Sequence, residues 1–478
     1  MKALWFLVAV GLLVTGQDQE GREPSTSWMH LYDPLDVDYT CNIPRAFHPS
    51  NAIKHFTSSG SKRAQQRYLV WGRGEGPRGG LGNDFVFWPA VFVSSLLSGR
   101  IPVIDDISQP IFKVSAICKR KYLDCQIPLL SSIDIGEVTE DMPSRRDKIT
   151  SSTVREALTS TSQLVRVTGY HRHSNWWTQN QTQAACVRKI LNCTDIVALQ
   201  RGGRDICVER AAMTLLAGRG AGIGLRPFAS SLVSRLKVGV KGKDQSAVNI
   251  QQKILTYLQE GNINEIRRGI GDEDESRIFG TAVHMRFQFP SVEVDGITED
   301  ERSLEATEWM TTEKNRKLID LLWNVTMSNN AGDGDDANAN TNIVQNNYTL
   351  MFISADSELM KEKLFQETLE RGTKLYAGLV PVYLPIHSNL THLRHFEDIE
   401  IGADDQTLPS IIFDWLMTSQ GQQVVSYRGV HSHFQSTFSL SAAMYGAPII
   451  FCDKAKHFIF KGKRLVFQRK LPHVLDNF

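Results

Sequence analysis

A short apolar segment, a run of glycines and a long apolar segment follow one another near residue 70, and this order narrows the possible folds. Tyr68–Trp71 predicts a buried strand, and the glycine-rich loop 72–83 comes directly after it. Phe85–Leu97 predicts a helix, in which Pro89 costs stability or introduces a kink. Ile101–Ile104 predicts a second strand. Strand, glycine loop, helix and strand in this order are typical of a βαβ unit with parallel strands.

The same alternation returns in the second half of the chain. Residues 140–275 are rich in predicted helices, at Ser152–Leu164, Cys207–Leu216 and Ala247–Gln259. From residue 278 we expect strands at Ile278–Phe289, Leu350–Ser354, Leu379–Leu384, Gln423–Ser426 and Pro448–Phe451. Helices are expected between them at Glu313–Trp323, Glu358–Arg371, Ser410–Ser419 and Phe438–Met444. The Asn/Asp/Gly-rich insertion 329–347 cannot bury a core, so we expect a disordered loop there.

This pattern predicts an α/β fold with two Rossmann-like domains, residues 61–275 and residues 276–478. Such domains bind ligands at the carboxyl ends of their parallel strands. The composition agrees with globular domains, since 41% of the residues are hydrophobic and 22% are charged. These values exclude a disordered chain, a fibre and a polytopic membrane protein.

The N-terminus predicts entry into the secretory pathway. Met1 and Lys2 precede the apolar run Ala3–Val14, and a polar segment follows Gly16. This is the plan of a signal peptide, residues 1–16, followed by a stem, residues 17–60. The apolar run is shorter than the ~20 residues that span a bilayer, although a retained signal-anchor is the alternative and would attach the protein to a membrane.

Sequons and cysteines agree with a lumenal location. N-x-[ST] sequons predict N-glycosylation at Asn180, Asn192, Asn324, Asn347 and Asn389. The seven cysteines are an odd number, so at least one thiol lacks a partner within the chain. We expect disulfide bonds, but the sequence does not fix their pairing. The expected compartment is the Golgi lumen, and secretion is the alternative.

The charge balance places any anionic ligand in a local site. Lys and Arg number 53 against 52 Asp and Glu, so the net charge of +1 creates no global field that would attract nucleic acid. The acidic runs 272–275 and 333–336 lie in predicted loops. We interpret them as solvated charge and expect no metal site.

Two segments have the residue types that hold phosphate. In the first, Gly79-Gly80-Leu81-Gly82-Asn83 leads from a strand into a helix, whose free N–H groups attract anions. A tight turn without a ligand is the alternative. In the second, residues 282–289 alternate between two faces, and one face has His284, Arg286 and Gln288. Arg forms a bidentate fork to a diphosphate, and His can bond a base, whereas a solvated edge strand would also show this pattern.

Two further segments have polar residues at predicted helix starts or strand ends. A buried Asp414 at a helix start could accept hydrogen bonds from guanine, and hydroxyls at 436–439 could bind phosphate oxygens. Ordinary helix caps would explain both observations. Asp356 follows the strand Leu350–Ser354, at the carboxyl end where α/β ligands bind.

The order of these motifs resembles the superfamily of GDP-fucose-dependent α1,2-, α1,6- and protein O-fucosyltransferases. G-G-L-G-N resembles their opening loop, V-H-M-R their H-x-R strand, and F-I-S-A-D-S their strand ending in an Asp-containing turn. F-D-W-L-M-T-S followed by S-T-F-S resembles their last nucleotide-binding segment. Residues 110–275 lie outside the resemblance. Phe287 and Asp84 depart from the pattern, since many relatives have Arg at the first position and Gln or Arg at the second.

The resemblance implies a GT-B-like fold, with two Rossmann-like domains facing a cleft, and an inverting transfer of fucose from GDP-fucose without a metal ion. By the same resemblance, Arg286 is catalytic and holds the β-phosphate, while His284 and Asp414 read guanine. The donor would also contact Gly79, Gly80, Leu81, Gly82, Asn83, Asp356, Ser436, Thr437, Phe438 and Ser439.

The acceptor and the general base stay open. Glu293 and Asp295 follow the H-x-R strand and are candidate bases, or solvated loop charges. The expected acceptor is a glycan or glycoprotein, with a protein O-fucosyltransferase as an alternative. A secreted protein that binds a glycan or a nucleotide on the same fold without catalysis is the alternative from a different class. A glycosyltransferase that uses another nucleotide sugar is also possible from these residues.

Overall fold

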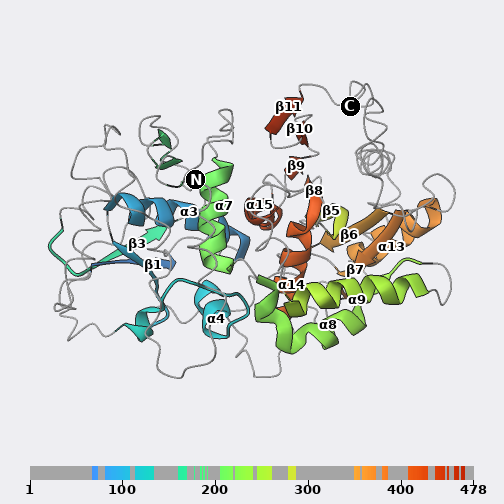
Figure 1. Cartoon of the computed structure of the whole chain (residues 1–478), viewed down its shortest axis with the longest axis horizontal. Helices are drawn as coiled ribbons and strands as arrows, with labels where there is room; N and C mark the ends of the chain where they lie inside the picture. Colours follow the sequence, from blue (N-terminus) through green and yellow to red (C-terminus); the bar gives the residue numbers. More distant parts are fainter. Residues whose placement is uncertain are drawn as a thin grey trace, which may run out of the picture. The chain divides into compact units, whose positions relative to one another are not determined.

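The computed structural model forms two α/β units (Figure 1). It describes residues 67–73, 81–98, 100–107, 113–133, 160–169, 177, 184–185, 187–188, 191, 205–218, 221–240, 245–260, 278–286, 349–355, 358–372, 379–385, 407–428, 436–446, 449–451, 457–461 and 464–468. Unit 1 is Met1–Ala221 with Asn262–Asp272, and unit 2 is Gly222–Gly261 with Glu273–Phe478. The predicted domain boundary after residue 275 differs from this division, because the segment 222–261 belongs to unit 2.

Unit 1 has the predicted βαβ opening. Strand β1 (Tyr68–Arg73) pairs in parallel with β2 (Ile101–Ile104) on one side and with β3 (Leu164–Gly169) on the other. The described helices of this unit are α3 (Leu81–Ser98), α4 (Lys113–Lys119), η4 (Leu130–Ser132) and α7 (Ile206–Ala217). Strand β3 begins at Leu164, where a helix was predicted to end. Residues 152–159 of that predicted helix lie outside the described residues.

Helix α3 is the buried centre of unit 1. It runs through Pro89, its ninth residue, without ending. Its Trp88 indole lies 5.1 Å from the Trp71 ring and donates a hydrogen bond of 2.5 Å to the carbonyl of Ala212 on α7. In the part of the chain that the structure describes, α3 is the helix long and apolar enough to cross a membrane. Because 89% of it is buried within the protein, it is a core helix.

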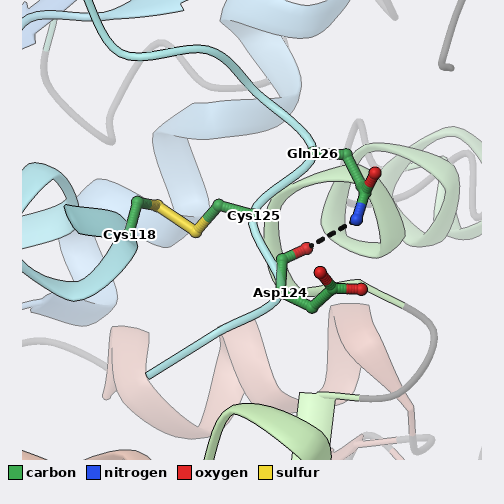
Figure 2. The surroundings of a disulfide bond; sticks show 4 residues. All are labelled: Cys118, Asp124, Cys125 and Gln126. Atoms are coloured by element: carbon green, nitrogen blue, oxygen red, sulfur yellow. Dashed lines mark hydrogen bonds between the residues drawn. A yellow bond between two sulfur atoms is a disulfide. The ribbon is translucent and has the colours of Figure 1, made fainter. Parts of the chain in front are cut away.

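A disulfide bond between Cys118 and Cys125 closes the turn after α4 (Figure 2). A backbone hydrogen bond holds this turn against α7, since the N–H of Asp124 donates to the carbonyl of Ala217 at 3.2 Å. Helix α7 ends at Ala217, and the φ of 76° at the following residue, Gly218, favours glycine. A Cβ atom at Gly218 would lie only 2.5 Å from that of Asp124. Cys207 is also disulfide-bonded, so the expectation of disulfides is confirmed.

Unit 2 contains a six-stranded sheet with the order β4-β7-β6-β5-β8-β9. Its strands are β4 (Lys237–Val238), β5 (Phe279–Arg286), β6 (Thr349–Ala355), β7 (Leu379–Tyr383), β8 (Gly421–Arg428) and β9 (Ile449–Phe451). Strand β4 is antiparallel to β7, and the other pairs are parallel. Strands β10 (His457–Lys461) and β11 (Arg464–Gln468) form a separate antiparallel pair.

The described helices of unit 2 are η7 (Ala221–Phe228), α8 (Ala229–Arg235), α9 (Gln245–Glu260), α13 (Glu358–Gly372), α14 (Thr407–Ser419) and α15 (Thr437–Tyr445). The chain extends the sheet from β5 through β6 to β7, and then places β8 and β9 on the other side of β5. The direction of growth therefore reverses between β5 and β8, which makes their carboxyl ends a topological switch point. The predicted α/β class with parallel sheets is confirmed.

Candidate functional site

Three polar residues lie side by side near the carboxyl ends of the central strands of unit 2. His284 on β5 pairs in register with Ser354 on β6 and with Ser426 on β8. All three are buried, and His284 is only 5% exposed. Residues in register on neighbouring parallel strands share a face of the sheet, so these side chains form one polar row.

Helix α15 covers this row. The ring of Phe438 stacks on the His284 imidazole with ring centres 5.1 Å apart. The hydroxyl oxygens of Ser426 and Ser439 are 2.7 Å apart, and Ser439 also bonds to the carbonyl of Ser436 at 3.1 Å. The structure therefore brings the predicted segment 436–439 to the predicted His284.

The charge at the first turn of α15 favours an anion. Ser436 occupies the N-cap position, but its hydroxyl forms no capping hydrogen bond. No acidic residue lies in the first turn. The first N–H groups of a helix have no partner within it and carry a partial positive charge. The interpretation of Ser436 as an ordinary side-chain cap is therefore wrong, whereas its proximity to a phosphate stays a prediction.

Asp414 joins this region from helix α14. It is the eighth residue of that helix, so the prediction that it lies at a helix start is wrong. Its carboxylate forms a buried ion pair with Lys361 of α13 at 2.5 Å, and Lys361 also donates to the carbonyl of Leu384 at 3.1 Å. Burial raises the pKa of Asp414, while Lys361, a hydrogen bond with Ser354 and the charge of Arg235 oppose that rise. Through Ser354, Asp414 is next to the His284 row.

Arg286 is the last residue of β5, two positions beyond His284. Alternation along the strand gives these two residues the same face. Arg428, the last residue of β8, is the Cα partner of Arg286. The structure thus places both residues at the end of one strand, and the pairing of their side chains stays a prediction.

Other predicted residues fall elsewhere. Leu81 and Gly82 are buried at the start of α3 in unit 1, where Asn83 is half-buried and Asp84 lies in the first turn. Several predicted residues lie outside the described residues: Gly79, Gly80, Glu293, Asp295, Asp356 and the sequon residues Asn180, Asn192, Asn324, Asn347 and Asn389. Among the described residues, no group of three or more His, Cys, Asp and Glu side chains could hold a metal ion.

Sequence reasoning missed three residues of this region. Ser426 lies in a predicted strand, and register alone reveals its position beside His284. Lys361 lies on a helix with many charged residues, so the sequence predicts that its side chain is exposed to solvent. Arg428 lies beyond the predicted end of its strand. None has a local signal, because each becomes informative only through its partner.

Comparison with known proteins finds likenesses among solved structures but none among family models or curated sequences. No protein-family model matches the chain, and no curated protein sequence does. The chain is similar to a mutant of Arabidopsis thaliana FUT1 in complex with GDP, with 11% identity over 97% of this chain and 90% of that chain and a TM-score of 0.41. It is also similar to NodZ α-1,6-fucosyltransferase soaked with GDP-fucose, with 11% identity over 85% of this chain and 100% of that chain and a TM-score of 0.23. Because both TM-scores are below 0.5, we base no functional inference on either likeness.

Proposed function

We propose that this chain transfers fucose from GDP-fucose to a glycan acceptor, with inversion at the sugar and without a metal ion. The observation that carries the proposal is the buried row of Ser354, His284 and Ser426 at the topological switch point, with Arg286 two residues beyond. Ligands of open α/β sheets bind at this place. The motif order described in the sequence supports the choice of donor.

Guanine is the base that fits Asp414. Its N1–H and its amino group are adjacent donors, and an ionised carboxylate is an acceptor only. The ion pair with Lys361 favours the ionised form of Asp414 against the effect of burial. Asp414 of α14 is linked to Ser354 of β6, and Ser354 lies in register with His284 of β5. In this proposal, Asp414 and His284 together recognise the base.

The diphosphate belongs, in this proposal, beside Arg286 and the start of α15. A guanidinium fork holds phosphate oxygens in two parallel hydrogen bonds, and helix N–H groups add fixed dipoles. When the sugar–phosphate bond breaks, negative charge develops on the departing GDP, and fixed donors stabilise it. Ser436, Thr437 and Ser439 would line this part of the site.

The compartment in this proposal is the secretory pathway. The Cys118–Cys125 disulfide supports it, because disulfides persist in oxidising compartments. The predicted signal peptide and the sequons agree with a lumenal enzyme.

Thermal unfolding with a panel of nucleotides tests the donor. GDP and GDP-fucose should stabilise the protein by about 2.7 kcal/mol at 100 times the dissociation constant, whereas UDP should not. Equal stabilisation by UDP and GDP would contradict the guanine assignment.

Release of GDP in the presence of glycan acceptors tests the activity. Transfer should continue in EDTA, and a loss that manganese restores would contradict the metal-free mechanism. Binding of GDP-fucose without release of GDP for any glycan or glycoprotein acceptor would favour the non-catalytic binding protein.

A further inference from the structure

Arg235, the last residue of α8, has more hydrogen-bond donors than its surroundings have acceptors. Its side chain is half-buried, and its Nη2 donates to the carbonyl of Pro385 at 2.6 Å. Its Nε and Nη1 are buried, and neither has a hydrogen-bond partner among the residues that the structure describes. A guanidinium carries several N–H donors in a fixed plane, and buried donors without acceptors cost free energy. A ligand with adjacent acceptors would satisfy this side chain.

The turn after β7 connects Arg235 to the buried ion pair of the candidate site. Lys361 donates to the carbonyl of Leu384 at 3.1 Å and to Oδ2 of Asp414 at 2.5 Å. Leu384 and Pro385 are consecutive residues, so two cations from different helices hold neighbouring carbonyls of this turn. The Arg235 guanidinium therefore lies in the same part of unit 2 as the carboxylate that we assign to the base.

The charges of these groups agree with that placement. Burial lowers the pKa of Arg235, whereas the charges of Glu358 and Asp414 oppose that change. Both carboxylates therefore lie near the guanidinium. Arg235 and Asp414 nevertheless form no hydrogen bond with each other, since Nη2 is bonded to Pro385 and the other two nitrogens are unbonded among the described residues.

A carboxylate beside an unbonded guanidinium matches one edge of guanine. Along this edge guanine presents its amino group and N1–H, which are donors, and then O6 and N7, which are acceptors. Asp414 accepts from the donors in the proposed function, and a guanidinium fork binds O6 and N7 in two parallel hydrogen bonds. Adenine has an amino donor in place of O6, so it would present a donor to the guanidinium.

We propose that Arg235 is a specificity-determining residue of the donor site and binds O6 and N7 of the guanine base. The inference rests on the proposed function and adds a residue to it. Arg235 belongs to the segment 222–261, which is part of unit 2 although it precedes β5 in the sequence. This segment would then supply a base-binding group to the unit that we assign to the nucleotide.

Calorimetric titration of the wild type with GDP, 7-deaza-GDP and IDP tests the assignment without a mutation. 7-Deaza-GDP has a carbon in place of N7 and should bind about 10- to 100-fold more weakly than GDP, the effect of losing a hydrogen bond to a charged group. IDP keeps O6 and N7 but lacks the amino group. Its weaker binding should therefore depend on Asp414 and not on Arg235.

Variants of Arg235 identify the group that senses N7. Arg235→Gln should weaken GDP binding and remove the preference for GDP over 7-deaza-GDP, while the preference for GDP over IDP is kept. Arg235→Lys keeps the charge beside Asp414 without the fork, so it should recover only part of the GDP affinity and little of the N7 preference. Arg226→Gln, at an exposed position of η7, is the matched control and should behave like the wild type.

The outcomes separate this inference from the proposed function. Equal binding of GDP and 7-deaza-GDP by the wild type would overturn the assignment of Arg235 and leave GDP as the donor, and this result needs no variant to fold. An undiminished N7 preference in folded Arg235→Gln or Arg235→Lys would overturn it as well, because Arg235 would then act only through its charge or its packing. If the wild type binds no guanine nucleotide, the proposed donor and this inference are both wrong.

Discussion

The helices that begin beside the carboxyl ends of the two parallel sheets differ in the charge of their first turns. In unit 1, Arg166 of β3 forms a buried ion pair with Asp105, which follows β2, at 2.8 Å. Helix α3 follows β1 there, and its first turn contains the carboxylate of Asp84. In unit 2, Arg286 and Arg428 end β5 and β8, Asp356 follows β6 in the sequence, and the first turn of α15 has no carboxylate.

The most visible phosphate motif in the sequence is therefore not the place where charge most favours a phosphate. The glycine-rich loop before α3 is the more visible phosphate signal in the sequence, yet Asp84 offsets the positive end of that helix. The sequence before α15 has fewer glycines, but the first turn of α15 contains no carboxylate that would offset the partial positive charge of the helix start. For a diphosphate, the balance of charge decides more than backbone permissiveness, and we therefore place the donor's phosphates in unit 2.

Each unit has a buried ion pair, and breaking each pair in turn should give the largest effects that distinguish unit 1 from unit 2. Lys361→Ala should cost about 3–5 kcal/mol of unfolding free energy, because it leaves Asp414 buried without its partner. Arg166→Ala should cost a similar amount in unit 1, where it strands Asp105. Only the Lys361 variant should also weaken GDP binding. Urea unfolding and GDP titration of both variants give the answer.

A double variant separates the two roles of the unit 2 pair. Lys361→Met with Asp414→Leu replaces the ions by apolar side chains and should restore most of the stability. It should not restore GDP binding, because the carboxylate is gone. Full GDP affinity in the double variant, or an equal loss of GDP affinity in Arg166→Ala, would remove the assignment of Asp414 to the base.

Arg286 gives the next largest effect. Arg286→Ala should reduce turnover roughly 100- to 1000-fold, the equivalent of about 3–4 kcal/mol, because fixed donors must stabilise the leaving diphosphate. Arg286→Lys should recover little, since a point charge cannot form the bidentate fork. Transfer rates are the measurement, with circular dichroism to confirm the fold. A folded Arg286→Ala variant with more than about a tenth of wild-type turnover would place the chemistry elsewhere.

Periodicity predicted most of the strands and helices that the structure describes. Strand β5 was predictable because its residues alternate between two faces, and β6 and β7 because they are short apolar runs bounded by polar segments. Strand β3 was missed because Arg166 interrupts its apolar pattern, and only the distant Asp105 explains that arginine. Strand β4 has two residues, too few for any periodic signal.

The residues of the candidate site on β5 were predictable from the sequence, whereas the residues that other elements place beside them were not. His284 and Arg286 share a face because of their spacing alone. The position of Asp414 was mistaken because α14 begins at Thr407 and not at Ser410, which makes Asp414 the eighth residue of the helix instead of the fifth. Lys361 and Arg428 become informative only through register and packing, which depend on segments far apart in the chain.

The smallest predicted effect concerns the first turns of the two helices. Asp84→Asn should lower the stability of unit 1 by about 0.3–1 kcal/mol, because it removes a favourable charge from the start of α3. It should change GDP affinity by less than about twofold, since we place no phosphate there.

The reverse change, Thr437→Asp, puts a carboxylate into the first turn of α15 and should weaken GDP binding while guanosine binding is kept. Calorimetric titration of both variants is the measurement. Stronger GDP binding by Asp84→Asn would show that the start of α3 also meets the diphosphate, and the contrast between the two sheet ends would then fail.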